Sequence, residues 1–318
     1  MNSSGNDPWE DQPSWTTWST TAIAFVGCIL NLLIIITYFD SSKLQSFMTN
    51  KIIASLAFTD FCTCLSKIFN VYIEPTLSVP SGILGYLFCH CIRTTYYLWA
   101  FVHISILHIL LVSVDRYIAV LHPVTYRSLS QKHDQMKVIL FLLYCGGAAL
   151  SLINIDLYTY AEENNMPQCV FTAADATEGL LLFKAIWHVI FTSICIYTII
   201  LVYIRIIQRV LIRSKVTQEY AKSQKNAQQL TMTSIAITFV FGASTFPTYV
   251  YACLYYIDVV TKLGLYLRVD NPVYHFCVQL TIASSFLNPC VYATQNRTFR
   301  SSFIAMNKRF LIFNGVFN

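Results

Sequence analysis

Seven long apolar segments constrain the fold of this chain more than any other feature of its sequence. They lie at about residues 17–39, 47–74, 86–120, 134–157, 180–212, 224–257 and 271–293. Each is close to or above the roughly twenty residues that a helix needs to cross a bilayer. Because lipid offers no water to unpaired backbone groups, runs of this length are expected to be helices. The sequence therefore predicts an all-α membrane protein built as a seven-transmembrane helix bundle.

The composition supports a membrane protein and argues against several other classes. Hydrophobic residues make up 55% of the 318 residues and charged residues only 12%, whereas a soluble protein carries roughly 25% charged residues. The net charge of +5 gives no reason to expect nucleic acid as a partner. The eleven cysteines show no CxxC spacing, so we expect no structural metal site.

The basic residues predict the orientation and the division of the chain. Sixteen of the 21 Lys and Arg residues fall on one side of the membrane, which the positive-inside rule makes cytoplasmic. The N-terminus, residues 1–16, is then extracellular, with Asn2 in an Asn-Ser-Ser glycosylation signal. Residues 17–293 form the transmembrane domain. Residues 294–318 carry Phe299, Phe303 and Met306 at three- and four-residue spacing, which predicts a short amphipathic helix at the membrane surface.

Polar residues recur at particular places inside the apolar segments. Asn31 lies in the first, Asp60 in the second, Asp115-Arg116-Tyr117 at the end of the third and Asn288-Pro289-Cys290-Val291-Tyr292 in the seventh. Ionisable residues inside a span mark functional sites by default. With Cys91 at the start of the third span, these motifs resemble, in order and position, the rhodopsin-like family of G-protein-coupled receptors.

The resemblance implies a switch at the cytoplasmic end. Arg116 is expected to pair with Asp115 at rest and to move toward Tyr203 and Tyr292 on activation. Val124 matches a position that enters the G protein, although a loop packing role is the alternative. The residues assigned to this switch are Asp115, Arg116, Tyr117, Val124, Tyr203, Asn288, Pro289 and Tyr292.

Two further sites follow from the same resemblance. A disulfide is expected between Cys91 and Cys169, with Cys89 as a competitor for Cys169. Four residues match the positions of a sodium site in related receptors, and a water-filled polar network without an ion is the alternative. These four are Asp60, Ser105, Ser285 and Asn288.

The chain also departs from the family pattern. The packing switch in mid-membrane corresponds to Ile106, Cys195, Phe241, Thr245 and Pro247. Cys195 stands where the fifth span usually has proline, and Thr245 where the sixth usually has tryptophan. Tyr144 replaces the tryptophan of the fourth span, and residues 226–229 supply no acid to restrain Arg116. These departures keep a non-signalling receptor-fold partner protein as an alternative.

The sequence predicts the position of a ligand site more clearly than its ligand. Leu98 stands where amine receptors have aspartate, and Ile282 where opsins have the retinal lysine, so neither ligand is expected. Lys67 either pairs with Glu74, reaches the membrane surface or binds an anionic group of the ligand. The expected lining is Lys67, Thr94, Leu98, Trp99, Val102, His103, Thr248, Tyr249, Tyr274 and His275.

This aromatic lining favours a short peptide. The prediction is a plasma-membrane receptor that activates a heterotrimeric G protein. We expect no enzymatic chemistry and no cofactor apart from the candidate sodium ion. A seven-span transporter is disfavoured because the chain shows no repeated halves with broken helices.

Overall fold

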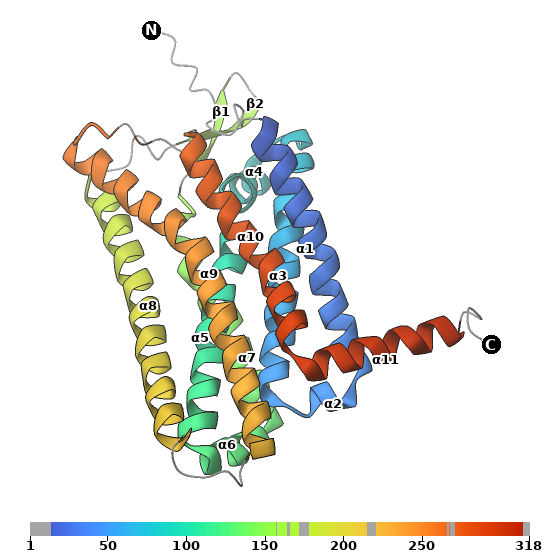
Figure 1. Ribbon diagram of the computed structural model, residues 1–318. Coiled ribbons are helices and arrows are strands. Elements are labelled where there is room, and N and C mark those ends of the chain that lie inside the picture. Colours follow the sequence, from blue (N-terminus) through green and yellow to red (C-terminus); the bar gives the residue numbers. More distant parts are fainter. Residues whose placement is uncertain are drawn as a thin grey trace.

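A computed structural model describes residues 14–156, 158–163, 166–171, 178–214, 221–265, 267 and 271–313. Seven long helices run side by side and form a bundle (Figure 1). They are α1 (Ser14–Asp40), α3 (Met48–Tyr72), α5 (Tyr96–Leu121), α7 (His133–Ser151), α8 (Glu178–Ser214), α9 (Ala221–Thr261) and α10 (Pro272–Gln295). Each of the seven predicted spans therefore contains a long helix, and the fold is a seven-helix bundle.

Shorter elements mark the two ends of the bundle. At one end, β1 (Tyr158–Glu163) pairs antiparallel with β2 (Met166–Phe171), close to η1 (Glu74–Thr76) and α4 (Gly82–Leu87). We call this the hairpin end. At the other end lie α2 (Ser42–Gln45), α6 (Pro123–Ser130) and α11 (Arg297–Phe313), and α11 runs sideways from the foot of the bundle (Figure 1). We call this the α11 end. The predicted amphipathic helix is α11.

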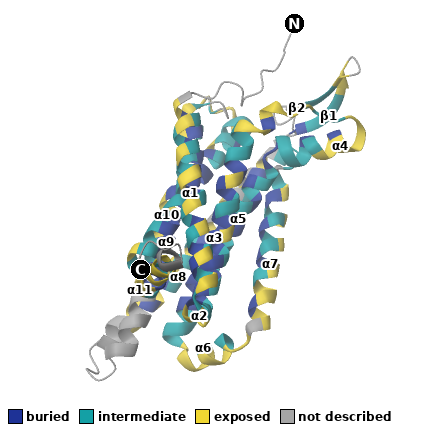
Figure 2. Ribbon diagram, turned by 90° about the vertical axis from the view of Figure 1, so that its right-hand side faces the viewer, coloured by how far each residue is buried: buried dark blue, intermediate teal, exposed yellow. Residues whose placement is uncertain are grey.

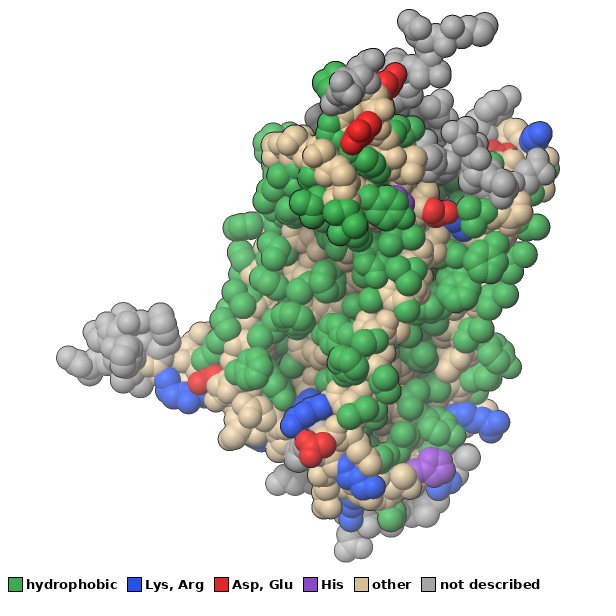
Figure 3. Space-filling model, turned by 180° about the vertical axis from the view of Figure 1, so that it is seen from behind, with side chains coloured by type: hydrophobic (Ala, Val, Ile, Leu, Met, Phe, Trp, Pro, Cys, Tyr) green, Lys and Arg blue, Asp and Glu red, His purple; other side chains and the backbone are tan. Residues whose placement is uncertain are grey.

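The outer surface of the bundle is suited to lipid. Large apolar side chains such as Phe25, Phe141, Ile194 and Phe239 are exposed. On the face seen in Figure 3, apolar side chains form a broad band between two ends that carry the charged groups. Six of the described helices are long and apolar enough to cross a membrane. The seventh, α7, has 19 residues and begins with polar residues. An apolar surface of this extent is found on membrane proteins rather than soluble monomers, so the chain is a multi-pass membrane protein.

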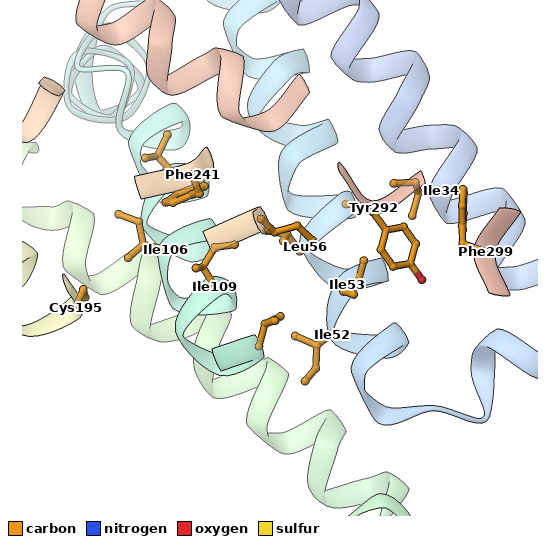
Figure 4. Close-up of a cluster of buried hydrophobic side chains, with 14 of the residues drawn as sticks. Ile34, Ile52, Ile53, Leu56, Ile106, Ile109, Cys195, Phe241, Tyr292 and Phe299 are labelled. Atoms are coloured by element: carbon orange, nitrogen blue, oxygen red, sulfur yellow. The ribbon is translucent and has the colours of Figure 1, made fainter. Parts of the chain in front are cut away.

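Buried and exposed residues alternate along the long helices of the bundle (Figure 2). The main apolar cluster joins α1, α3, α5, α8, α9 and α10 to the start of α11 (Figure 4). Leu56, Ile109 and Phe241 lie within it, and Tyr292 and Phe299 form its border with the α11 end. This packing fixes the relative positions of the polar groups that follow.

The third span differs from its predicted boundary. Residues 86 and 87 end α4, a π-helical segment η2 (Phe88–Arg93) follows, and the chain is left-handed at Thr95, with φ 53°. A non-glycine residue rarely adopts this conformation inside a helix. The long helix α5 therefore starts only at Tyr96, and the prediction of one helix over residues 86–120 is wrong for its first ten residues.

Candidate functional site

A buried carboxylate occupies the middle of the bundle. Asp60 of α3 is completely buried. Its Oδ1 accepts hydrogen bonds from the hydroxyls of Ser105 and Ser285, each at 3.0 Å, and its Oδ2 accepts one from Asn288 Nδ2 at 2.9 Å. The structure thus brings together the four residues expected to form a sodium site.

The oxygen atoms in this cluster fit a small hard cation. The Asn288 side-chain oxygen is buried and has no partner among the described residues. With the Asp60 carboxylate and the Ser105 and Ser285 hydroxyls, it provides the hard oxygen ligands that such ions prefer. The three donors also stabilise the charge of Asp60 in the absence of an ion, because a buried carboxylate needs such partners.

Next to this cluster, the kink in α10 is tied to α1. Pro289 has no N–H and leaves the carbonyl of Ser285, four residues earlier, without its helical donor. Asn31 of α1 donates to this carbonyl oxygen at 2.8 Å and to its own Gly27 oxygen at 2.9 Å. Pro289 therefore frees the Ser285 carbonyl oxygen, and Asn31 supplies the donor that this oxygen lacks.

At the α11 end, Arg116 is held by three groups through four hydrogen bonds. Its guanidinium donates to Asp115 Oδ2 at 2.6 and 3.0 Å, to the Tyr126 hydroxyl at 3.1 Å and to the Thr49 hydroxyl. Thr49 in turn donates to the same Asp115 oxygen at 2.8 Å. Arg116 is 3% exposed, so its charge is neutralised inside the protein by the neighbouring carboxylate.

The two tyrosines expected to receive Arg116 lie elsewhere in this conformation. The Tyr203 hydroxyl forms hydrogen bonds with Ser113 at 3.3 Å and Thr238 at 3.0 Å. The Tyr292 hydroxyl donates to Asn50 at 3.1 Å. The geometry is thus that of the expected resting state, with Arg116 bound to Asp115.

The remaining members of the predicted switch are spread over this end. The Tyr117 ring lies 5.9 Å from the His122 ring. Val124 is 82% exposed on α6, so it makes little contact with its own loop. Its exposure is unusual for a valine and leaves it available to a partner.

The expected packing switch is assembled only in part. Ile106, Cys195 and Phe241 meet in the main core cluster (Figure 4). Thr245 turns back on its own helix, where its hydroxyl donates to the Phe241 carbonyl oxygen. Pro247 lies within α9. A threonine bound to its own backbone cannot swing between helices as a large aromatic side chain does.

The hairpin is linked to the bundle by a different cysteine from the one expected. The disulfide joins Cys89 to Cys169 with their Cα atoms 5.4 Å apart, and Cys91 is a free thiol. The prediction of a Cys91–Cys169 bond, which followed the spacing typical of the related receptors, is wrong. The π-helical turn of η2 and the break at Thr95 rotate the chain, and Cys89 becomes the residue that faces β2.

The expected ligand-lining residues gather toward the hairpin end. Most are buried; only Trp99 and Tyr274 are half-buried. Leu98 packs with Ile282 in a small apolar cluster. Thr248 bonds the Cys277 carbonyl oxygen and the Thr281 hydroxyl, each at 2.7 Å. Thr94 bonds back to the His90 carbonyl oxygen.

Aromatic rings complete this region. The His103 ring lies 5.4 Å from the Phe191 ring and 6.2 Å from the Tyr249 ring. Tyr274 lies 5.3 Å from Tyr251 and 6.0 Å from His275. Trp99 and Val102 pack in the main cluster beneath them.

The hydrogen-bond partners of His103 show which of its two ring nitrogens carries the hydrogen. Its Nδ1 lies 2.8 Å from both the Trp99 carbonyl oxygen and the Ser151 hydroxyl oxygen. A carbonyl can only accept, and Ser151 donates its own proton to the Gly147 oxygen at 3.1 Å. Nδ1 therefore carries the hydrogen, and the buried Nε2, which has no partner among the described residues, is an acceptor in the neutral ring.

Some functional contacts were not predicted from the sequence. Thr49 and Tyr126 had no role in the expected switch, yet both bind Arg116. Lys184 is 2% exposed and forms an ion pair with Asp156 at 2.6 Å. The Thr49–Arg116 and Lys184–Asp156 pairs join residues 67 and 28 positions apart in the sequence, and no local spacing signals them.

A polar network also joins α3, α5 and α7. His108 Nε2 bonds the Ser55 hydroxyl at 2.8 Å, and the Tyr144 hydroxyl lies 3.1 Å from the hydroxyls of both Ser55 and Thr59. Tyr144 therefore fills the place of the family's tryptophan by hydrogen bonding. His108 is a helix-packing residue in this arrangement.

The comparison with known protein families decides among the classes that this geometry allows. The model of the 7 transmembrane receptor (rhodopsin family) matches residues 30–292. The chain belongs to this family. The receptor is thus a seven-span membrane receptor, as the fold and the resemblance indicated.

Similar curated receptors differ in what their names say they bind. The receptor is 28% identical over 314 residues to neuropeptide Y receptor type 4 of Mus musculus, covering 92% of this chain and 78% of that one. It is 25% identical over 313 residues to adenosine receptor A3 of Canis lupus familiaris, covering 93% and 92%. Dopamine receptor 3 of Caenorhabditis elegans is 31% identical over 140 residues, 44% of this chain and 22% of that one.

Proposed function

We propose that this receptor resides in the plasma membrane with its N-terminus outside and activates a heterotrimeric G protein from its α11 end. A ligand binds among the helices at the hairpin end and favours an open α11 end. By thermodynamic linkage, the bound G protein then strengthens ligand binding. The single observation that supports this best is the enclosed Asp115–Arg116 pair, because a buried charge held at one helix end is poised for release.

The charge distribution supports the orientation. Among the described residues, Lys43, Arg127, Lys132, Arg300 and Lys308 lie in or beside the short elements at the α11 end. An excess of basic residues marks the cytoplasmic side. The glycosylation signal at Asn2 lies outside the described residues, and its use follows only from this orientation.

A sodium ion is proposed for the Asp60 cluster. Its support is the unpartnered Asn288 oxygen beside the Asp60 carboxylate and two serine hydroxyls. When bound, the ion would neutralise Asp60 and stabilise the state whose oxygens fit it better. The residues of this chain supply only the oxygen ligands and their orientation.

A short peptide is the proposed ligand class. The support is the group of aromatic side chains toward the hairpin end, since Trp99, Tyr249 and Tyr274 offer large contact areas with few rotamers to order. The neuropeptide receptor among the similar proteins agrees with this choice. The adenosine receptor named above matches over nearly the same length, so likeness alone does not select the ligand.

Basal nucleotide exchange in cell membranes tests the proposal before any ligand is known. The wild type is compared with Arg116→Ala at matched surface expression, on a panel of G proteins. We expect higher exchange by the wild type on at least one of them. Exchange that stays equal in the two proteins, with and without peptide and small-molecule ligand libraries, contradicts the proposal.

A non-signalling partner protein is the second candidate. The observation that favours it is Thr245, whose hydroxyl is bound to its own helix in the place of a mobile aromatic side chain. This alternative predicts normal surface expression and no exchange under any condition. It also predicts that a co-expressed receptor changes its own surface level when this chain is present.

A further inference from the structure

Lys67 is a lysine buried inside a membrane helix. It lies seven residues after Asp60 on α3, which is nearly two helical turns, or about 10 Å toward the hairpin end. Two whole turns return to the same face, so Lys67 lies on the inward face above the Asp60 cluster. The residue is 6% exposed, so its ammonium is enclosed by the protein.

The partner of Lys67 is neutral. Its Nζ donates to Asn70 Oδ1 at 3.3 Å, and no other hydrogen bond or ion pair of this lysine is found in the described part of the chain. An ammonium carries three donors, so two remain unused. The direct Lys67–Glu74 pair that the sequence allowed is not formed.

Glu74 is occupied by other groups. Its Oε1 forms an ion pair with Arg93 at 2.6 Å, and its Oε2 accepts from Asn70 Nδ2 at 2.9 Å. Asn70 therefore stands between Lys67 and the carboxylate. A charge in the low dielectric of a helix bundle is expensive without a charged partner, and the amide oxygen of Asn70 offsets only part of this cost.

The two unused donors of the Lys67 ammonium define what is missing. An ammonium only donates, so the group that would satisfy it is an acceptor. Its charge favours an acceptor that is negative.

We propose that Lys67 binds a carboxylate group of the ligand. The charge and the two unused donors of its ammonium match the single charge and two oxygens of a carboxylate. A phosphate carries more charge and calls for a second cation, and Arg93, the neighbouring arginine among the described residues, is already paired with Glu74. The proposal specifies the ligand of the receptor site argued above and rests on that site, but not on signalling.

Thermal unfolding of the purified full-length receptor in detergent tests the proposal without the natural ligand. The probes are two carboxylates, each with its neutral amide as a match: N-acetylglycine with N-acetylglycinamide, and butyrate with butyramide. N-acetylglycine represents a free peptide C-terminus and butyrate a fatty acid. A ligand that binds only the folded state raises the melting temperature, and we expect roughly 2–4 °C at saturating concentration.

Three variants locate the binding. Lys67→Met keeps the length of the side chain without its charge and should abolish the rise, whereas Lys67→Arg should retain part of it. Lys184→Met removes another buried lysine, one that already has the carboxylate partner Asp156, and should leave the rise intact. The comparison of each acid with its amide in the wild type remains decisive even where a variant fails to fold.

The outcomes separate clearly. A rise with one or both acids, absent with the amides and lost in Lys67→Met, supports the proposal, and the more effective acid indicates whether the ligand resembles a peptide end or a fatty acid. No rise with either acid, an equal rise with the amides, or a rise that persists in Lys67→Met overturns it. A rise of the same size with choline chloride, which supplies chloride without sodium, indicates a site for inorganic anions and also overturns it. Because thermal unfolding does not report nucleotide exchange, its failure is distinct from failure of the receptor function.

Discussion

Asn31 of α1 donates a hydrogen bond of 2.8 Å to the carbonyl oxygen of Ser285, the group that Pro289 leaves without its helical partner. The bond ties the first helix to the kink of the seventh. It also places the Ser285 hydroxyl, which donates to Asp60 at 3.0 Å. The side-chain amide of Asn31 thus stabilises both the kink of α10 and the Asp60 cluster beside it.

Replacement of Asn31 by leucine should lower stability. The change leaves the Ser285 carbonyl buried without a donor, which costs about 1–2 kcal/mol. The melting temperature of the purified receptor measures this loss. Thr63→Ala is the matched control, since the buried Thr63 hydroxyl donates to the Thr59 oxygen of its own helix and bonds no other helix in the described part of the chain. Equal stability of the two variants would show that the contact with Ser285 contributes nothing.

Asp115→Asn should raise basal nucleotide exchange. The substitution removes the charge that neutralises Arg116 at a distance of 2.6 Å, and with it the interaction that favours the resting state. A loss of about 1 kcal/mol in that state shifts the ratio of resting to open receptor about fivefold. Thr49→Val is the control, because it removes a hydroxyl partner of Arg116 and keeps the ion pair. Exchange by Asp115→Asn at or below the wild-type rate contradicts the prediction.

Sodium should stabilise the receptor through Asp60. We expect the melting temperature to rise with sodium chloride more than with choline chloride at the same ionic strength. Asp60→Asn, which removes the negative charge and keeps the shape of the side chain, should abolish the difference. A sodium effect that is absent in the wild type, or unchanged in the variant, favours the polar network without an ion.

The sequence predicted the parts of this receptor that local patterns determine. Apolar length alone located seven helices, and helical periodicity predicted α11 from Phe299 and Phe303. These patterns are imposed by the membrane or by the helix itself, so they are visible in the chain. The cluster of Asp60, Ser105 and Asn288 was predicted only by the resemblance to the receptor family.

The parts that were missed depend on contacts between distant segments. The left-handed backbone at Thr95 is not encoded by a glycine, and its rotation of the chain exchanged Cys91 for Cys89 as the partner of Cys169. Thr49 approaches Asp115 only because α3 and α5 pack side by side. Such contacts follow from tertiary packing, which one sequence does not specify by spacing.

Cys89→Ser should reduce the amount of folded receptor at the cell surface. The bond closes a loop across a sequence separation of 80 residues, and loss of such a disulfide typically costs about 2–5 kcal/mol. Cys91→Ser is the matched control, two residues away, and should behave as the wild type. Surface labelling measures both, and peptide mapping without reduction identifies the bonded pair. Loss of expression in Cys91→Ser but not in Cys89→Ser would reverse the assignment.

Tyr144 should stabilise the receptor through its hydroxyl rather than its ring alone. The hydroxyl lies 3.1 Å from those of both Ser55 and Thr59, and Ser55 also bonds His108. Tyr144→Phe keeps the ring, whose centroid lies 5.5 Å from that of His108. It removes the hydroxyl that bonds the side chains of Ser55 and Thr59. We expect a loss of about 1 kcal/mol, read as a lower melting temperature. Tyr144→Trp restores the residue that is usual in the family, but its single N–H cannot accept from Thr59 or Ser55, so it should recover only part of the loss. Full recovery in Tyr144→Trp would mean that the size of the aromatic ring, and not the hydroxyl, holds α7 against α3 and α5.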